Sequence, residues 1–230
     1  MSLFVIADLH LSLGTNKPMD VFRGWNNYVE RLKENWDKLV TEKDTVVIAG
    51  DISWAMRLED AENDFRFIHE RPGKKLILKG NHDYWWSTKT KMNNYLHGLG
   101  FDDIEFIHNS ACIVGDVAVC GTRGWMYNSE SPEDKKVVLR EVGRLKASIE
   151  EAVKAGVKPI VFLHYPPVYD IYVCHEILDT MKEYGITDCY YGHIHGTQAA
   201  KKAPFGEHEG VKMHLISCDY LGFMPMLVSR

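Results

Sequence analysis

Five short motifs along the 230-residue chain combine histidine, aspartate and asparagine directly after apolar runs. In order they read Asp8-Leu9-His10, Gly50-Asp51, Gly80-Asn81-His82-Asp83, His164 and Gly192-His193-Ile194-His195. Carboxylate, amide and imidazole donors without a thiolate suit Mn, Fe, Zn, Co or Ni. A carboxylate such as that of Asp51 can bridge two ions, because it has two oxygens. The motifs therefore indicate a metal site built from oxygen and nitrogen ligands.

Each motif taken alone has an ordinary structural explanation. A Gly-Asp pair after a strand is most often a turn in which the carboxylate accepts backbone N–H groups, and Asn81 suits a turn in the same way. His164 is compatible with a buried residue bonded to the backbone. These explanations would all have to hold at successive strand ends, so the joint pattern favours one shared site. Residues i and i+2 of an extended chain point the same way, so we expect the members of Asp-x-His and His-x-His to reach one ion.

Short apolar runs that stop at the polar motifs predict buried strands at residues 3–7, 45–49, 75–78, 117–120, 160–163 and 189–191. Helical spacing of apolar residues predicts helices over residues 19–40, 58–70, 87–99, 132–155 and 174–184. Residues 211–228 indicate a hairpin or paired strands. Strands that alternate with helices predict an α/β sheet structure, and ligands bind beyond the strand ends of such sheets. The motifs are therefore expected to meet at one sheet edge.

This ordered set of motifs resembles that of the calcineurin-like metallophosphoesterases, from Asp8 to His195. The resemblance implies two mixed β-sheets packed face to face with flanking helices, a four-layer αββα sandwich. The length suits a single domain over residues 1–230. The resemblance also implies two metal ions, with Mn, Fe or Zn expected. The ligands of one ion would be Asp8, His10, Asp51 and His195, and those of the other Asp51, Asn81, His164 and His193.

The same resemblance implies a hydrolytic mechanism. Two divalent ions would outweigh Asp8 and Asp51 and leave about two positive charges, which suits a phosphate group and a hydroxide. A metal-activated hydroxide would attack phosphorus, and His82 would protonate the leaving oxygen. We expect a phosphohydrolase, with a phosphodiester or nucleotide-type substrate favoured. A phosphomonoesterase, including a protein phosphatase, is an alternative, and so is a non-catalytic metal-binding scaffold.

The second motif departs from the protein Ser/Thr phosphatases of this family, which carry Gly-Asp-x-x-Asp-Arg-Gly. Here the stretch reads Gly-Asp-Ile-Ser-Trp-Ala-Met over residues 50–56, so the second Asp and the Arg are absent. This difference disfavours a protein phosphatase and leaves the group that orients His82 unidentified. Asp83 is a candidate for that role, with bracing of the turn as the alternative.

Two further features bear on substrate choice. Arg123 follows the predicted strand at 117–120 and could bind phosphate through its fork of donors, with a surface ion pair as the alternative. Tyr84, Trp85 and Trp86 could stack on a flat group, although we expect at least one of them in the core.

Composition indicates a water-soluble protein. The net charge of −5 argues against binding of nucleic acid through bulk positive charge. A local basic groove would not be visible in the net charge, so nucleic acid stays open as a partner.

The N-terminal stretch has no basic region before its apolar residues, and no apolar run reaches the roughly 18 residues of a membrane span. We therefore predict a cytoplasmic enzyme that does not bind a membrane and that acts on a phosphorylated small molecule or nucleotide. The pattern does not define an oligomeric state. The five cysteines lack a C-x-x-C pair and are expected to be reduced.

Overall fold

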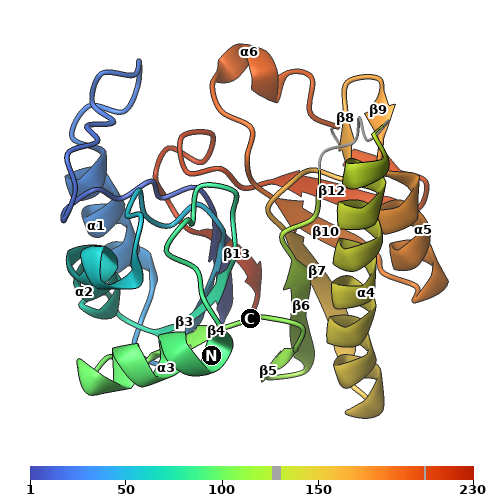
Figure 1. Ribbon diagram of the computed structural model, residues 1–230, viewed down its shortest axis with the longest axis horizontal. Helices are drawn as coiled ribbons and strands as arrows, with labels where there is room; N and C mark the ends of the chain where they lie inside the picture. The colour runs from blue at the N-terminus through green and yellow to red at the C-terminus, as the bar shows by residue number, and fades with distance from the viewer. Residues whose placement is uncertain (126–130, 205) are drawn as a thin grey trace.

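The computed structural model describes residues 1–125, 131–204 and 206–230. Two β-sheets lie face to face, with three helices outside the first sheet and two outside the second (Figure 1). On the first side these are α1 (Tyr28–Leu39), α2 (Glu62–His69) and α3 (Lys89–Gly98), and on the second α4 (Pro132–Lys154) and α5 (His175–Glu183). A 3-10 turn, η1 (Leu58–Ala61), precedes α2, and the short helix α6 (Thr197–Ala200) lies above the sheets. The predicted αββα sandwich is confirmed.

The first sheet has the order β13-β1-β2-β3-β4. Its strands β1 (Leu3–Ile6), β2 (Thr45–Ala49), β3 (Lys74–Leu78) and β4 (Ile104–Phe106) are parallel, and β13 (Met226–Ser229) pairs antiparallel with β1. The second sheet has the order β11-β12-β10-β7-β6-β5. Its parallel centre consists of β12 (Val211–Leu215), β10 (Asp188–Tyr191), β7 (Lys158–Leu163) and β6 (Val117–Thr122). The antiparallel edges are β11 (Gly206–His208) and β5 (Cys112–Val114), and a separate pair is formed by β8 (Val168–Tyr169) and β9 (Tyr172–Val173).

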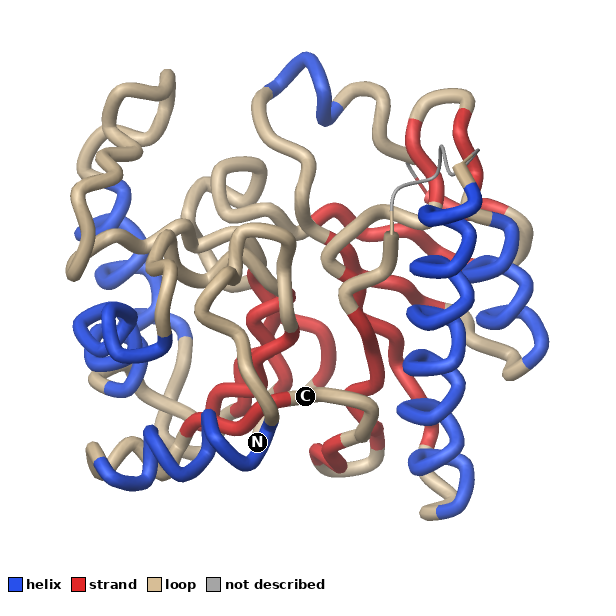
Figure 2. The backbone as a smooth tube through the Cα atoms, in the orientation of Figure 1, coloured by secondary structure: helices blue, strands red, loops and turns tan. Residues whose placement is uncertain are grey.

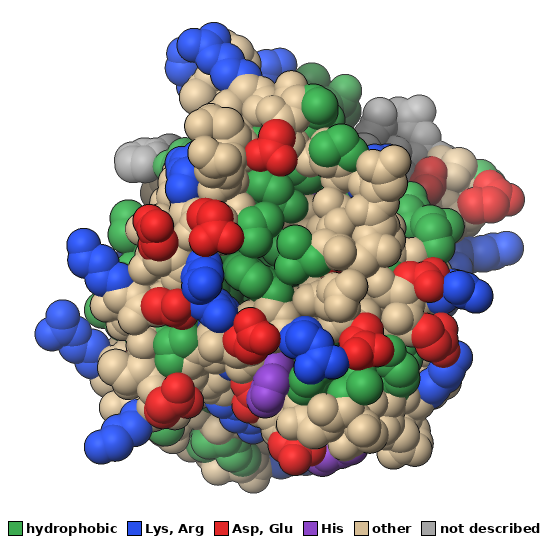
Figure 3. Space-filling model, turned by 90° about the vertical axis from the view of Figure 1, so that its left-hand side faces the viewer, with side chains coloured by type: hydrophobic (Ala, Val, Ile, Leu, Met, Phe, Trp, Pro, Cys, Tyr) green, Lys and Arg blue, Asp and Glu red, His purple; other side chains and the backbone are tan. Residues whose placement is uncertain are grey.

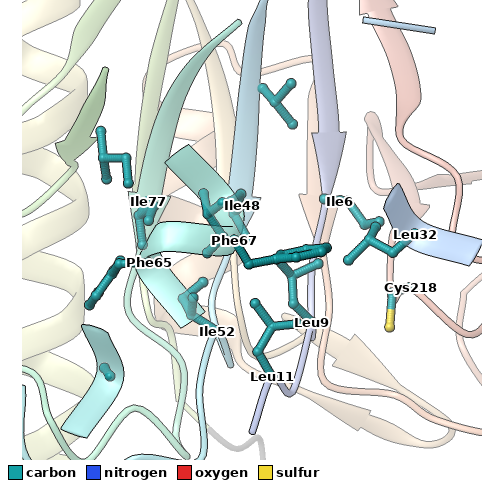
Figure 4. Close-up of a cluster of buried hydrophobic side chains, with 14 of the residues drawn as sticks. Ile6, Leu9, Leu11, Leu32, Ile48, Ile52, Phe65, Phe67, Ile77 and Cys218 are labelled. Carbon is teal, nitrogen blue, oxygen red and sulfur yellow. The ribbon is translucent and has the colours of Figure 1, made fainter. Parts of the chain in front are cut away.

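Alternate side chains of the central strands enter different hydrophobic layers. In β2, Ile48 belongs to the layer under α1 and α2, whereas Val47 belongs to the layer between the two sheets. Figure 4 shows the first of these layers, where Ile48 lies among side chains that include Leu32 of α1 and Phe65 of α2. Strands buried on both faces need apolar residues at almost every position. This requirement explains why the central strands are visible in the sequence as continuous apolar runs.

The parallel strands of both sheets end at one edge of the sandwich. Figure 2 shows that the loops after these strands (tan) gather above the sheets, between the two helical layers. Backbone hydrogen bonds join these loops. The N–H of Ala7 donates to the carbonyl of Ile216 (2.9 Å), which connects the two sheets, and the N–H of Gly192 donates to that of His164 (3.2 Å), which connects neighbouring strands of the second sheet. The predicted convergence of the motifs is therefore confirmed, but the strands that carry them belong to two sheets instead of one.

The helix predicted over residues 19–40 is wrong in its first half, because α1 begins only at Tyr28. Gly24 (φ 91°) and Asn27 (φ 51°) adopt left-handed backbone conformations that a right-handed helix does not contain. Residues 12–27 instead form a loop outside the first sheet, at the top left of Figure 1. Figure 3 shows this side of the molecule, where basic side chains gather at the top and charges of both signs surround a hydrophobic patch.

The prediction of a hairpin or paired strands over residues 211–228 is also wrong. The two strands in this stretch do not pair with each other, because β12 pairs with β10 in one sheet and β13 with β1 in the other. The intervening residues cross from one sheet to the other. In the described part of the chain, no helix is both long and apolar enough to cross a membrane.

Candidate metal centre

The predicted metal ligands lie together at the shared sheet edge. Asp8, His10 and His195 each place a donor atom within 4.8 Å of the others, and Asp51, His164 and His193 form a second such group. Asp51 lies between the groups: its Oδ2 is 3.7 Å from Nε2 of His10 and 3.5 Å from Nε2 of His164. The remaining predicted ligand, Asn81, places Oδ1 2.6 Å from Nε2 of His164. The structure thus brings together all seven residues predicted as ligands.

Unusual backbone conformations direct four of these side chains. Asp8 (φ 62°), His10 (φ 46°), Asp51 (φ 52°) and His193 (φ 71°) lie in the left-handed region, which residues other than glycine seldom adopt. Such strain is concentrated at functional sites in proteins, where surrounding contacts hold it in place. Here the N–H of Asp8 donates to the backbone carbonyl of Gly50, and the N–H of His10 donates to the backbone carbonyl of Asp51, each at 2.9 Å.

These conformations correct the expectation based on extended i, i+2 geometry. Asp8 and His10 do share a group, but neither residue is extended. For His193 and His195 the expectation is wrong, because the two side chains belong to different groups. The positive φ at His193 turns the chain, so the alternation of a strand does not continue past Tyr191.

Two glycines allow the carboxylates to approach the backbone closely. A Cβ on Gly80 would lie 2.1 Å from Oδ1 of Asp51, and a Cβ on Gly192 would lie 2.5 Å from Oδ2 of Asp8. The carboxylate of Asp8 also accepts the backbone N–H of His193, at 3.0 Å and 2.9 Å to its two oxygens. Each carboxylate therefore contacts a glycine, and any larger residue at that glycine would displace the carboxylate.

Second partners fix which imidazole nitrogen faces the centre. Nδ1 of His164 donates to the carbonyl of Ala49 (3.2 Å), which leaves the lone pair of Nε2 directed at Asp51 and Asn81. Nδ1 of His195 donates to Oδ1 of Asp219 (3.0 Å), and its Nε2 lies 3.2 Å from Nε2 of His10. Partners of this kind orient histidine ligands toward metals in proteins. Two imidazole nitrogens that face each other this closely suit a shared cation.

The charges of the centre also favour a cation. Burial lowers the pKa of His10 and of His193 to about 3, so both imidazoles are neutral donors at pH 7. Burial, and then the neighbouring Asp8, raise the pKa of Asp51 to about 8. Burial opposes charge on His195, but Asp8 and Asp219 outweigh it and raise the pKa of His195 to about 10. Two interacting buried carboxylates, Asp8 and Asp51, are costly unless positive charge offsets them, so the donor set fits metal ions.

Asp83 braces the turns instead of orienting His82. Its buried carboxylate accepts the backbone N–H groups of Asp51 (2.9 Å) and Gly80 (2.7 Å) and the indole N–H of Trp85 (3.1 Å). Burial, and then the nearby Asp51, raise the pKa of Asp83 to about 7. Asp83 therefore joins the turn after β2 to the turn after β3, which is the alternative that the sequence left open.

The ring of His82 has an aromatic neighbour in place of a carboxylate. The backbone N–H of His82 donates to Oδ1 of Asp51 (2.8 Å). The ring centroid lies 4.4 Å from that of Trp54, and Nδ1 of His82 is buried without a hydrogen-bond partner among the described residues. Trp54 occupies the position of the second Asp in the protein-phosphatase pattern. It also stacks on the His10 ring, with centroids 4.9 Å apart.

The aromatic triplet after Asp83 divides as expected. Trp85 is buried in the core at 2% exposure, and Trp86 packs against the same hydrophobic layer. Tyr84 is 55% exposed, and its ring lies 6.1 Å from that of His82. Of the three, Tyr84 is therefore the residue placed to meet a bound group.

The guanidinium of Arg123 contacts α4 rather than the ligand groups. Its Nη2 lies 3.6 Å from Oε1 of the buried Glu141, and the guanidinium lies 4.7 Å from the Trp125 ring centroid. Only the backbone of Arg123 meets the centre directly, because its carbonyl accepts the N–H of His164 (3.2 Å) and of Tyr165 (2.9 Å). The ion-pair alternative for Arg123 is thus what the structure contains.

Sequence reasoning missed two residues at the centre. Asp219 holds the His195 ring and also accepts the N–H of Gly196 (2.8 Å). It lies in the crossing between the sheets, a stretch that the sequence presented as part of a hairpin. The amine of Lys17 lies 4.4 Å from the Trp54 ring centroid, so the loop before α1 reaches the side of the centre that carries His82. No sequence signal linked Lys17 to the motifs.

The fold and this arrangement of donors define a class of metallohydrolase, and comparison with known proteins identifies the family. Residues 1–197 match the model of the calcineurin-like phosphoesterases. The chain belongs to this family. Membership supports metal-dependent hydrolysis of phosphoester bonds and the use of divalent metal ions. A comparison with curated proteins finds no significant match.

Solved structures share the fold at low sequence identity. A protein from Thermus thermophilus has a TM-score of 0.59 at 13% identity, covering 99% of this chain and 97% of that chain. A phosphopantetheinyl hydrolase from Mycobacterium tuberculosis has a TM-score of 0.58 at 12% identity, covering 99% and 95%. A protein of unknown function from Aquifex aeolicus has a TM-score of 0.54 at 15% identity, covering 98% and 95%. These likenesses extend over nearly the whole of each chain and concern the fold.

Proposed function

We propose that the chain hydrolyses phosphoester bonds at two metal ions, one in each donor group, with Asp51 as the shared ligand. The position of Asp51 carries this proposal, because its Oδ2 lies 3.7 Å from His10 Nε2 on one side and 3.5 Å from His164 Nε2 on the other. Asp8, His10 and His195 would complete one set of ligands, and Asn81, His164 and His193 the other. Mn, Fe or Zn suit these donors.

The residues of the chain would transfer the proton and orient the groups that take part in the reaction. The ions, when bound, would supply a hydroxide from water at neutral pH and stabilise negative charge on phosphoryl oxygens. His82 would give a proton to the leaving oxygen through the ring nitrogen opposite the buried Nδ1. Trp54 holds that ring by contact, and the bond from the His82 N–H to Asp51 fixes its backbone. Asp219 and the Ala49 carbonyl hold the rings of His195 and His164 in place.

A phosphodiester or nucleotide-type substrate suits the surroundings of His82. Tyr84 is exposed beside it, and Lys17 lies over Trp54 on the same side. An aromatic side chain can stack on a base, and an amine can bind a phosphate oxygen. Arg123, whose guanidinium lines a cavity beside the centre, would bind a phosphate group of the substrate. Phosphopantetheine esters, the substrates that the name of the structural neighbour from Mycobacterium tuberculosis indicates, are also phosphodiesters and enter the test below.

The test is turnover by protein loaded with Mn. We expect two equivalents of bound metal and faster release of nitrophenol from bis(p-nitrophenyl) phosphate than from p-nitrophenyl phosphate. The Asp51→Asn variant should lose both metal and turnover, whereas Asp116→Asn, at an exposed turn, should keep both. Preference for the monoester would overturn the diesterase assignment. Two bound metals with no turnover of either ester, or of a phosphopantetheine ester, would favour the scaffold.

A further inference from the structure

A small cavity beside the metal centre has mainly cationic walls. It measures about 200 Å³ and is lined by Lys79, Arg123, Val137, Arg140, Glu141 and Arg144. Four cationic side chains thus face one carboxylate, on a protein whose net charge is −5. The cavity is smaller than the roughly 300–1,000 Å³ that a whole small-molecule ligand occupies. Its size and charge suit a single anionic group of a larger molecule.

Glu141 offsets only part of the positive charge of the cavity. Its carboxylate is buried at 1% exposure, and Nη1 of Arg144 donates to its Oε1 at 2.6 Å. The hydroxyl of Thr122 donates to the other oxygen, Oε2. Glu141 thus pairs with Arg144 and, at 3.6 Å, with Arg123, but its single negative charge offsets only one of the four positive charges around it.

Arg123 retains an unused donor inside this arrangement. Its Nε is buried and has no hydrogen-bond partner among the described residues. A buried donor without a partner is costly, so such groups in native proteins often mark the place of a ligand or water. The planar guanidinium offers paired N–H groups that match the oxygens of a phosphate. The cavity and its excess of positive charge together indicate an anion, and the guanidinium of Arg123 lies in its wall.

The cavity and the metal centre share two loops. Lys79 lies two residues before Asn81, in the turn after β3. The carbonyl of Arg123 accepts the N–H of His164 at 3.2 Å, in the turn after β6. Arg140 and Arg144 add the flank of α4, which packs against β6 and β7. A substrate whose scissile group lies at the ligand groups can therefore extend along these loops into the cavity.

We propose that this cavity binds a second phosphate group of the substrate, so that the enzyme prefers phosphoesters that carry an additional phosphate away from the scissile bond. The proposal rests on the proposed function for the reaction itself. The existence of an anion site does not depend on it. Substrates of this class include nucleotides phosphorylated at a second position.

The decisive comparison uses two substrates that differ only in the second phosphate. They are the p-nitrophenyl ester of thymidine 5′-phosphate and the same ester with a 3′-phosphate. We expect wild-type kcat/KM to be higher for the phosphorylated ester by about tenfold, the effect of one charge-assisted contact. The ratio should fall to about one in Lys79→Gln/Arg140→Gln and should fall partly in Arg140→Gln, a change at an exposed helix position that the fold tolerates. It should persist in the control Lys135→Gln/Lys136→Gln, which removes two charges from exposed positions of α4 outside the cavity.

No preference in the wild type, or a preference that survives in Lys79→Gln/Arg140→Gln, would overturn the proposal. If wild-type protein with two bound metals turns over neither ester, the proposed function fails. The anion site is then tested separately, by measuring whether the cavity binds an anion. Calorimetry with inorganic pyrophosphate in EDTA should then give saturable binding that the cavity variants lose and the control keeps. Absent binding, or equal loss in the control, would rule out an anion site.

Discussion

The indole of Trp54 lies 4.4 Å from the imidazole of His82, where the protein-phosphatase pattern places a carboxylate. His82 therefore packs against the hydrophobic face of an indole, and its buried Nδ1 forms no hydrogen bond with any described residue. Contact with Trp54 on one face, and the backbone bond to Asp51, replace a charged orienting partner. In this respect His82 resembles His10, whose ring also packs on Trp54, and differs from His164 and His195, whose rings are held by the Ala49 carbonyl and the Asp219 carboxylate.

The first prediction concerns His82 itself. His82→Ala should reduce kcat by roughly 10²–10⁴-fold, the usual contribution of a general acid, while metal content stays at the wild-type level. Steady-state kinetics together with elemental analysis of the purified protein measure both. His97→Ala, at a histidine on α3 that is 68% exposed, is the matched control and should change neither. Full activity of His82→Ala would remove His82 from the reaction.

A second prediction uses the two glycines that touch the carboxylates. Gly80→Ala and Gly192→Ala should lower metal content strongly, because the new Cβ would fall 2.1 Å from Oδ1 of Asp51 or 2.5 Å from Oδ2 of Asp8. The rest of the fold should persist, with unchanged far-UV circular dichroism. Wild-type metal content in both variants would mean that the carboxylates can shift without loss of the centre.

Gly143 provides the control for those substitutions and a prediction of its own. It lies within α4, and apart from its chain neighbours and the helix backbone no atom of the described residues is within 4 Å of a Cβ added there. Gly143→Ala should therefore raise the free energy of unfolding by about 0.5–1 kcal/mol, because alanine loses less backbone entropy in a helix. Denaturant titration of the metal-free protein measures this change. Destabilisation would indicate a contact at this helix face that the structure lacks.

Asp219 gives a fourth prediction. Asp219→Asn should weaken metal affinity by about 10–100-fold, as loss of a partner that orients a ligand histidine typically does. The residue is not itself a predicted ligand, so metal at high concentration should restore turnover. Competition with a chelating dye measures the affinity. Asp188→Asn, which removes a carboxylate bonded to His214 in β12, should leave the affinity unchanged.

The fifth prediction is a pH dependence of stability. Burial raises the pKa of Asp64 to about 6 from 3.8, so the fold favours its neutral form. The contribution of Asp64 is therefore fully present below about pH 4 and is lost as pH rises through about 6. Free energies of unfolding measured with EDTA across this range should decline less in Asp64→Asn than in the wild type. Equal slopes would mean that Asp64 is already charged in the folded protein.

The sequence was a good guide to the central strands and a poor one to the edges. β2 lies at residues 45–49 as predicted, because a strand buried on both faces contains only apolar residues. β5 escaped notice because it is an edge strand of three residues, with Ile113 53% exposed. The positions of β12 and β13 depend on which sheet each strand joins, and local pattern does not encode that choice.

The candidate site was predictable in its donors but not in its geometry. Asp8, His10 and the other ligand candidates are recognisable because metal chemistry requires their side-chain types. The left-handed backbone at Asp8 and His193 arises from hydrogen bonds between distant loops, which no local pattern reports. Asp219 was missed for the same reason, because its role depends on the crossing between the sheets. Metal binding by the seven residues, a single domain and a cytoplasmic location stay predictions.

The antiparallel pairing of β1 with β13 has a consequence for how the protein is made. Leu3 pairs with Ser229, so the strand that leads into Asp8 keeps one open edge until the far end of this sequence has been synthesised. Asp219 also emerges late. A ribosome-bound chain that stops short of these residues would carry most of the ligands on an unclosed sheet, and contacts so distant in sequence form slowly. Closure of the first sheet and orientation of the His195 ring therefore both depend on residues 217–229.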